Sequence, residues 1–162
     1  MYNNRNSIPK PQTFLKTITI IFSALVIGQV LFGVVAFFDT PNKGVILTPG
    51  NDPFFYIAPA LAVSGCILGM FLFKQQVAKL EDKQTLVEKL GIYQTALITR
   101  YACSEGPSLF AIVCYLLTGN LYYLIIAGLN VIYFIWMRPT QFRLEDNLNL
   151  SYEDKMAMET NN

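Results

Sequence analysis

Four long apolar stretches constrain this chain more than any other feature of its sequence. They cover residues 18–38, 54–73, 96–117 and 121–137 of the 162 residues. A helix needs roughly 20 apolar residues to cross the ~30 Å hydrocarbon layer of a bilayer, and each stretch approaches or exceeds that length. The pattern predicts an all-α membrane protein, a bundle of four transmembrane helices in a lipid bilayer.

The positions of Lys and Arg predict how the bundle is oriented. These residues cluster before the first stretch, between the second and third, and after the fourth, whereas the other two connections hold only Lys43. Because cytoplasmic loops carry an excess of Lys and Arg, we expect both termini and the middle loop in the cytoplasm of a bacterial inner membrane. The chain then divides into a cytoplasmic N-terminal segment (1–13), a transmembrane domain (14–138) and a polar cytoplasmic tail (139–162).

Local signals predict where the helices begin and end. Asp52-Pro53 is typical of a helix start, and Thr85 with Glu88 forms a capping box. Helices two and three are therefore expected to extend into the cytoplasm, with helix three the longest. Gly119-Asn120 predicts a tight turn into helix four, and Pro139 ends that helix. In the tail, Ser151 is expected to cap at most a short helix, while an apolar set is expected to lie on the bundle or the lipid headgroups: Phe142, Leu144 and Leu148.

Composition excludes several classes of function. With 53% hydrophobic residues and a net charge of +1, the chain has no basic field for nucleic acid. It has no histidine, which excludes bis-histidine haem and an imidazole base, and its three cysteines form no Cys-x-x-Cys pair. We therefore expect Cys66, Cys103 and Cys114 to be packing residues, and we expect no cofactor and no enzymatic activity.

Glu105 is the residue most open to a functional interpretation, because it is the only carboxylate within the four stretches. An acid inside a membrane is costly unless it is paired, protonated or in contact with water. At similar depth the sequence offers Gln29, Asn130 and Ser64, with Tyr101 one helical turn before the acid. Pro107 is expected to kink helix three and to free a carbonyl beside Glu105. These residues form a candidate buried polar or ion site: Glu105, Gln29, Asn130, Ser64, Tyr101 and Pro107.

Small residues predict close packing between helices. Helix two carries Ala58, Ala62, Gly65 and Gly69 at heptad-like spacing. Such residues let two backbones approach, which drives packing where lipid supplies no hydrophobic force between helices. Gly28 and Gly106 are predicted packing residues in helices one and three. The four small residues of helix two are expected to pack against a helix of the same chain or of a second copy.

An internal repeat appears when the first stretch is aligned with the third. Ala24, Gly28 and Phe32 then match Ala102, Gly106 and Phe110, at an offset of 78 residues. The second and fourth stretches align more weakly. The chain is thus interpreted as a duplicated two-helix hairpin, in which helices one and three run in the same direction.

The run RYACSEGPSLF from Arg100 to Phe110, with LTGN from Leu117 and RPT from Arg138, resembles a group of uncharacterised four-helix bacterial inner-membrane proteins. The likeness covers most of the chain and implies the four-helix fold but no activity. A duplicated hairpin with one buried glutamate is also similar to the proteolipid subunits of rotary ATPases. Those proteins carry the acid in the second helix of a hairpin, whereas Glu105 lies in the first.

Two hypotheses follow. The first is a non-enzymatic membrane protein that acts as a structural or interaction component of a complex, as a homo-oligomer or with another membrane protein. Under this hypothesis Glu105 is a protonated acid bonded to Asn130 or Gln29. The alternative is a proton- or cation-coupled translocation component centred on Glu105, assisted by Gln29, Asn130 and the carbonyl that Pro107 frees. A membrane enzyme is the least favoured interpretation, because Glu105 has no second acid with which to share catalysis.

Overall fold

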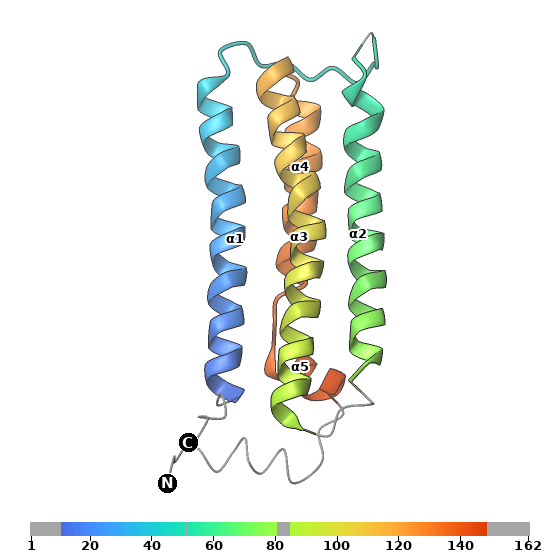
Figure 1. The fold of residues 1–162 in the computed structure, drawn as a ribbon. Helices are drawn as coiled ribbons and strands as arrows, with labels where there is room; N and C mark the ends of the chain where they lie inside the picture. The colour runs from blue at the N-terminus through green and yellow to red at the C-terminus, as the bar shows by residue number, and fades with distance from the viewer. Residues whose placement is uncertain (1–10, 51, 81–84, 149–162) are drawn as a thin grey trace, which may run out of the picture.

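The computed structural model describes residues 11–50, 52–80 and 85–148, and these residues form five α-helices and no strand (Figure 1). The helices are α1 (Pro11–Asp39), α2 (Phe54–Ala78), α3 (Leu86–Thr118), α4 (Leu121–Trp136) and α5 (Gln141–Leu148). The all-helical class predicted from the sequence is confirmed. Most of the N-terminal segment, and the tail beyond residue 148 with Ser151, lie outside the described residues.

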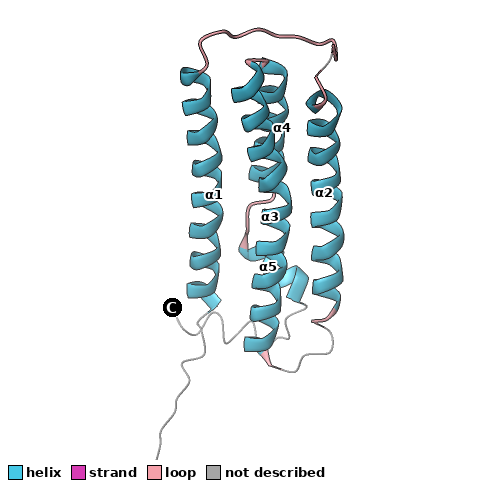
Figure 2. Cartoon of the chain, turned by 45° about the horizontal axis from the view of Figure 1, so that its top comes forward, coloured by secondary structure: helices cyan, strands magenta, loops and turns pink. Residues whose placement is uncertain are grey.

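The four long helices stand side by side, with α3 in front of α4 and with α1 and α2 on either side (Figures 1 and 2). Helices α1 and α3 run in one direction, and α2 and α4 run in the other. These directions agree with the predicted pair of hairpins. The duplication itself stays a prediction.

Local capping explains where the helices begin and end. The Asp52 carboxylate accepts a hydrogen bond from the Phe54 amide at 3.0 Å, so α2 begins one residue later than Asp52-Pro53 alone suggests. The Thr85 hydroxyl accepts from the Glu88 amide at 3.4 Å, and α3 is the longest helix at 33 residues. Gly119 ends α3 with a φ of +67°, a left-handed conformation that glycine adopts without steric cost. The predicted cap at Thr85 and the predicted turn at Gly119 are confirmed, whereas the predicted N-cap of α2 at Asp52 is wrong by one residue, because Pro53 occupies that position.

Aromatic side chains form two layers in one of the two core clusters. In one layer, Phe22 of α1 stacks on Phe134 of α4 with centroids 5.1 Å apart, and Tyr101 of α3 lies 5.4 Å from both. In the other layer, Phe14 and Phe73 contact Tyr93. Each layer draws on three helices, so the layers fix how the helices are rotated against each other.

Helix α5 was not predicted as an element, although its apolar residues were expected to lie on the bundle. Leu144 and Leu148 are buried in the same core cluster as Tyr93 and Tyr101. Phe142 instead leaves 78% of its surface exposed. The amphipathic spacing of Leu144 and Leu148 gives α5 one face to bury, which is why this short helix forms against the bundle.

The connection between α1 and α2 is fixed to the α3–α4 turn by Asn120. The Asn120 side chain accepts from the Ile46 amide at 3.0 Å and donates to the Ile46 carbonyl at 2.9 Å, while its Oδ1 also accepts from the Tyr122 amide at the start of α4. Backbone bonds join Gly44 to Gly119 and Leu121. The first connection is therefore held across the end of the bundle.

Length and composition identify α1 (over Thr13–Asp39) and α2 as helices that can cross a membrane. A third candidate is the pair of α4 and α5, which is bent by 70°. Helix α4 alone has 16 residues, or about 24 Å, and α3 carries Glu88, Lys89, Arg100 and Glu105. Two or three candidate spans thus support a membrane protein, and the predicted set of four is not confirmed by this criterion.

Two of the small residues of α2, Gly65 and Gly69, pack on α3 of the same chain. A Cβ atom added at Gly65 would collide with the Cys103 carbonyl oxygen and lie 2.7 Å from Pro107, and one at Gly69 would lie 3.2 Å from the Cβ atom of Cys103. Ala58 is fully buried and Ala62 is half-buried. By contrast, a Cβ atom at Gly28 or Gly106 would meet nothing within 4 Å. Gly28 and Gly106, which the sequence predicted as packing residues, therefore lie open in the described bundle.

We expect Gly65→Ala to destabilise the protein by about 1–3 kcal/mol, because backbone atoms of α3 must move to admit the methyl group. Thermal unfolding of the purified protein in detergent measures this effect. Gly91→Ala is the matched control, since a Cβ atom there meets nothing within 4 Å and alanine favours a helix. Equal unfolding temperatures for the two variants would contradict the close contact.

Asn120→Ala is expected to destabilise the protein by about 1–3 kcal/mol, because it removes a helix cap and both side-chain bonds to Ile46. Hydrogen exchange should show faster exchange at the Ile46 amide. Thr48→Ala, a substitution of an exposed residue in the same connection, should leave that rate unchanged. Unaltered exchange at Ile46 in Asn120→Ala would show that other contacts hold the connection.

Candidate functional site

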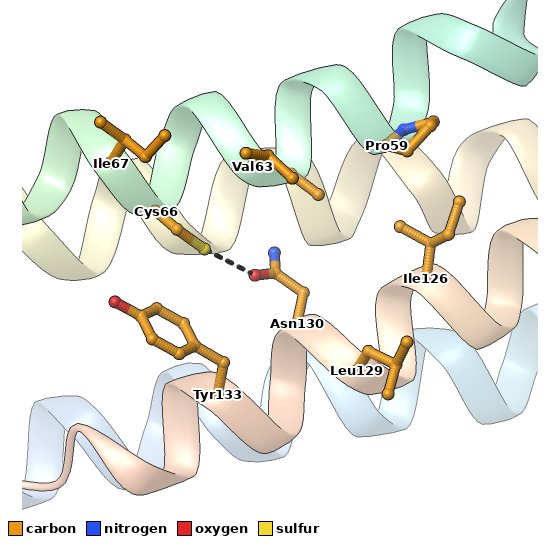
Figure 3. A pocket seen from close by; sticks show the side chains of 9 residues that line it. Pro59, Val63, Cys66, Ile67, Ile126, Leu129, Asn130 and Tyr133 are labelled. Carbon is orange, nitrogen blue, oxygen red and sulfur yellow. Dashed lines mark hydrogen bonds between the residues drawn. The ribbon is translucent and has the colours of Figure 1, made fainter.

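Buried polar side chains from α1, α3 and α4 lie in the interior of the bundle: Gln29, Ser104, Ser108 and Asn130. Asn130 joins three helices. Its Nδ2 atom donates to the Ser104 carbonyl of α3 at 2.8 Å, and its Oδ1 atom accepts from the Cys66 thiol of α2 at 3.5 Å (Figure 3). A polar side chain in this position links helices by bonds that lipid cannot replace.

Several buried oxygens of the same region have no partner among the described residues. They are Oε1 of Gln29, the hydroxyls of Ser104 and Ser108, and the Tyr101 hydroxyl. The amide nitrogen of Gln29 donates back to the Leu25 carbonyl at 3.3 Å. A buried polar atom without a partner costs free energy, so these oxygens are potential sites for water or for an ion.

Two of the sequence-predicted residues lie apart from Asn130. Tyr101 is fully buried and packs against the stacked rings of Phe22 and Phe134. Ser64 is exposed, and its hydroxyl donates to the Leu61 carbonyl at 3.1 Å. Neither side chain is bonded to Asn130 or to Glu105.

Glu105 directly follows Ser104 in α3 and is half-buried. The hydrogen bonds of Asn130 and Gln29 go to other groups, and the structure gives the Glu105 carboxyl no hydrogen bond with any described residue. Its neighbours Ala102 and Gly106 are exposed. The predicted bond from Glu105 to Asn130 or Gln29 is therefore not formed, because the acid lies toward the outer side of α3 whereas Ser104 is turned into the bundle.

Pro107 lies inside α3, and the helix continues through it to Thr118. Proline removes the amide that would bond the Cys103 carbonyl, and this carbonyl contacts Gly65 of α2. The freed carbonyl thus serves helix packing. Pro59 acts in the same way in α2, where the Tyr122 hydroxyl donates to the Phe55 carbonyl at 3.4 Å.

Comparison with known protein families, with curated proteins and with solved structures found no match. The likeness to four-helix inner-membrane proteins drawn from the sequence therefore stays an expectation. Within the described ranges no group of three or more His, Cys, Asp or Glu residues could hold a metal ion.

Sequence reasoning missed Cys66, Ser104 and Ser108 as members of the interior polar set. Ser104 and Ser108 are four residues apart, which places them on one helical face, and this spacing was the available signal. Cys66 gave no such signal, because its bond to Asn130 depends on how α2 and α4 are rotated.

Asn130→Leu should destabilise the protein by about 0.5–2 kcal/mol, since leucine keeps the volume but loses the bond to the Ser104 carbonyl. Unfolding of the protein in detergent by a denaturing surfactant measures the change. Gln75→Leu, at an exposed position of α2, is the control and should have no comparable effect. If Asn130→Leu leaves the free energy of unfolding unchanged, the Asn130 amide contributes no net stability.

Proposed function

We propose that this chain is a polytopic protein of the bacterial inner membrane, with four spans and with both ends in the cytoplasm. The distribution of apolar side chains supports the proposal. Large apolar residues on the outer faces of α1, α2 and α4 are 57–65% exposed, whereas polar Gln29 and Asn130 are buried. The exposed set includes Ile27, Leu31, Val35, Ile67, Phe71, Leu129 and Ile132. An apolar exterior of this extent suits lipid and is unfavourable in water.

Helices α3 and α4 are included among the four proposed spans because they stand alongside α1 and α2 (Figure 1). The outer side of α3 is apolar at Ile98, Val113 and Leu117, which are 41%, 40% and 70% exposed. The N-terminal part of α3, before residue 96, then lies in the cytoplasm with the end of α2 and with α5. A span shorter than the bilayer is accommodated by local thinning, which makes 16 residues sufficient for α4.

Reporter fusions test this topology. Alkaline phosphatase joined after residue 50 or after residue 120 should be active outside the cytoplasm, and a fluorescent protein at the C-terminus should fluoresce inside. If only α1 and α2 cross the membrane, the fusion after residue 120 will be inactive while the one after residue 50 stays active. The fusion after residue 120 therefore decides between two spans and four.

Glu105 is the basis for proposing a non-enzymatic interaction component of a membrane complex. The acid has no hydrogen bond with a described residue, and the small residues Ala102 and Gly106 beside it are exposed. A carboxyl group facing hydrocarbon needs a partner, and small neighbours let another backbone come close. A helix of a second copy, or of another membrane protein, that donates a hydrogen bond would satisfy Glu105.

Translocation centred on Glu105 is the second candidate. The unpartnered oxygens of Gln29, Ser104 and Ser108 favour it, since they could bind water or a cation inside the bundle. This function requires water to reach Glu105. An interaction surface requires only a partner helix.

Site-specific photocrosslinking in cells tests the interaction surface. A photoreactive amino acid at Ala102 should give a discrete protein adduct, and Glu105→Ala should reduce the yield severalfold. The same probe at Leu68, an exposed position of α2, is the control and should react with lipid alone. A protein adduct at Leu68 equal to that at Ala102 would contradict the proposed surface.

Purified protein in liposomes tests the second candidate. If a cation gradient drives proton movement through the unmodified protein but not through Glu105→Gln, the protein is a translocation component and the proposed interaction role is wrong. Absence of this flux, together with the Ala102 adduct, would favour the interaction component.

A further inference from the structure

An arginine-lined pocket of about 390 Å³ lies where α4 turns into α5. Arg100 of α3 lines it together with Arg138 and Arg143, and Asp146 is the acidic residue beside them. The remaining walls are largely aromatic and apolar, including Phe73, Tyr93, Tyr133 and Trp136. Three guanidinium groups against one carboxylate favour an anionic ligand.

Arg100 is held in the pocket with a free donor. Its guanidinium carbon lies 5.1 Å from the centroid of the Phe73 ring, a cation–π contact. Its Nε atom is buried and has no hydrogen-bond partner among the described residues. Arg143 is fixed as well, since its Nη1 atom donates to the Trp136 carbonyl at 3.2 Å. Planar guanidinium groups fixed in this way match the oxygens of a phosphate group.

An apolar groove of about 390 Å³ leads to this pocket between α2 and α4 (Figure 3). Tyr133 lines both the groove and the pocket. On α2, Met70 and Phe73 of the pocket continue the helical face that lines the groove. The groove is lined by Pro59, Ala62, Val63, Cys66, Ile67, Ile126, Leu129, Asn130 and Tyr133.

The path formed by the groove and the edge of the pocket has about the length of one lipid leaflet. From Pro59 in the groove to Met70 in the pocket is about 16 Å along α2 at the rise of an α-helix. Half of the ~30 Å hydrocarbon layer is about 15 Å. In the proposed topology the arginines lie at the cytoplasmic end of this path, at the depth of the headgroups of the inner leaflet.

We propose that the groove and the pocket together bind one anionic phospholipid, with its phosphate on Arg100 and Arg143 and an acyl chain along the groove. A helix of a second copy would cover the groove but would leave the three arginines with Asp146 as the one acidic residue of the pocket lining. The proposal rests on the proposed membrane location and is independent of the Glu105 surface. The lipid would stabilise the α4–α5 corner, because the phosphate joins α3 to the residues after α4.

Native mass spectrometry of the delipidated full-length protein tests the proposal. With phosphatidylglycerol added, one lipid adduct should be retained, and phosphatidylcholine with the same chains should bind more weakly. Arg100→Gln and Arg143→Gln should each weaken phosphatidylglycerol binding about fivefold. Lys74→Gln, which removes an exposed cation of α2 outside the pocket, is the matched control and should change nothing.

The groove has its own pair of variants. Val63→Trp should reduce lipid retention because the indole fills the groove, whereas Leu68→Trp, at an exposed residue outside it, should not. A photoreactive phosphatidylglycerol carrying its label on the acyl chain should modify the parent protein at Val63, Leu129 or Tyr133. This labelling experiment uses the unmodified protein, so its result does not depend on whether a variant folds.

Three outcomes would overturn the proposal. Equal retention of the two lipids would show that the arginines do not select a headgroup. Displacement of the adduct by inorganic phosphate, with no effect of Val63→Trp, would indicate a free-phosphate site. A dimer in place of the lipid adduct would assign the groove to a second copy. If the protein is absent from the membrane fraction, the proposed membrane location is refuted instead. Glu105→Ala should leave lipid retention unchanged, because the lipid site is independent of Glu105.

Discussion

The contact between Gly65 of α2 and the Cys103 carbonyl of α3 sets the spacing on which the rest of the bundle depends. Two elements of the sequence create it: glycine leaves room for the carbonyl, and Pro107 frees that carbonyl from its own helix. With α2 held against α3 here, Cys66 comes within bonding distance of Asn130, whose amide also bonds the next carbonyl, that of Ser104. Contacts within one turn of α3 therefore fix how α2 and α4 are aligned along it.

The same pairing of a proline with a freed carbonyl occurs near the other end of α2. Pro59 releases the Phe55 carbonyl, and the Tyr122 hydroxyl bonds to it while the Phe55 and Tyr122 rings stack with centroids 4.5 Å apart. In a membrane, an unpaired carbonyl has no water to satisfy it. Each proline in the two helices therefore coincides with a contact to a neighbouring helix, which explains how both are tolerated inside continuous helices.

Sequence alone predicted the features that depend on neighbouring residues. The helix starts at Asp52 and Thr85 and the turn at Gly119 follow from short-range hydrogen bonds and from the conformational freedom of glycine, so they were found within about one residue. The rotation of each helix was not predictable in this way. The outward-facing and core-facing sides of α1 and α2 are both apolar, and the hydrophobic pattern therefore does not show which side of each helix faces the core. This is why the sequence placed Glu105 with Gln29 and Asn130, while the structure turns Ser104 inward instead.

The link from Asn120 to Ile46 joins residues 74 positions apart, across the end of the bundle. During synthesis, α1, α2 and their connection leave the ribosome long before Asn120 does. In the proposed four-span topology, the hairpin of α1 and α2 would enter the membrane before Asn120 is present to bond Ile46. The bonds that hold the first connection across the end of the bundle therefore form only after the turn between α3 and α4 has been made.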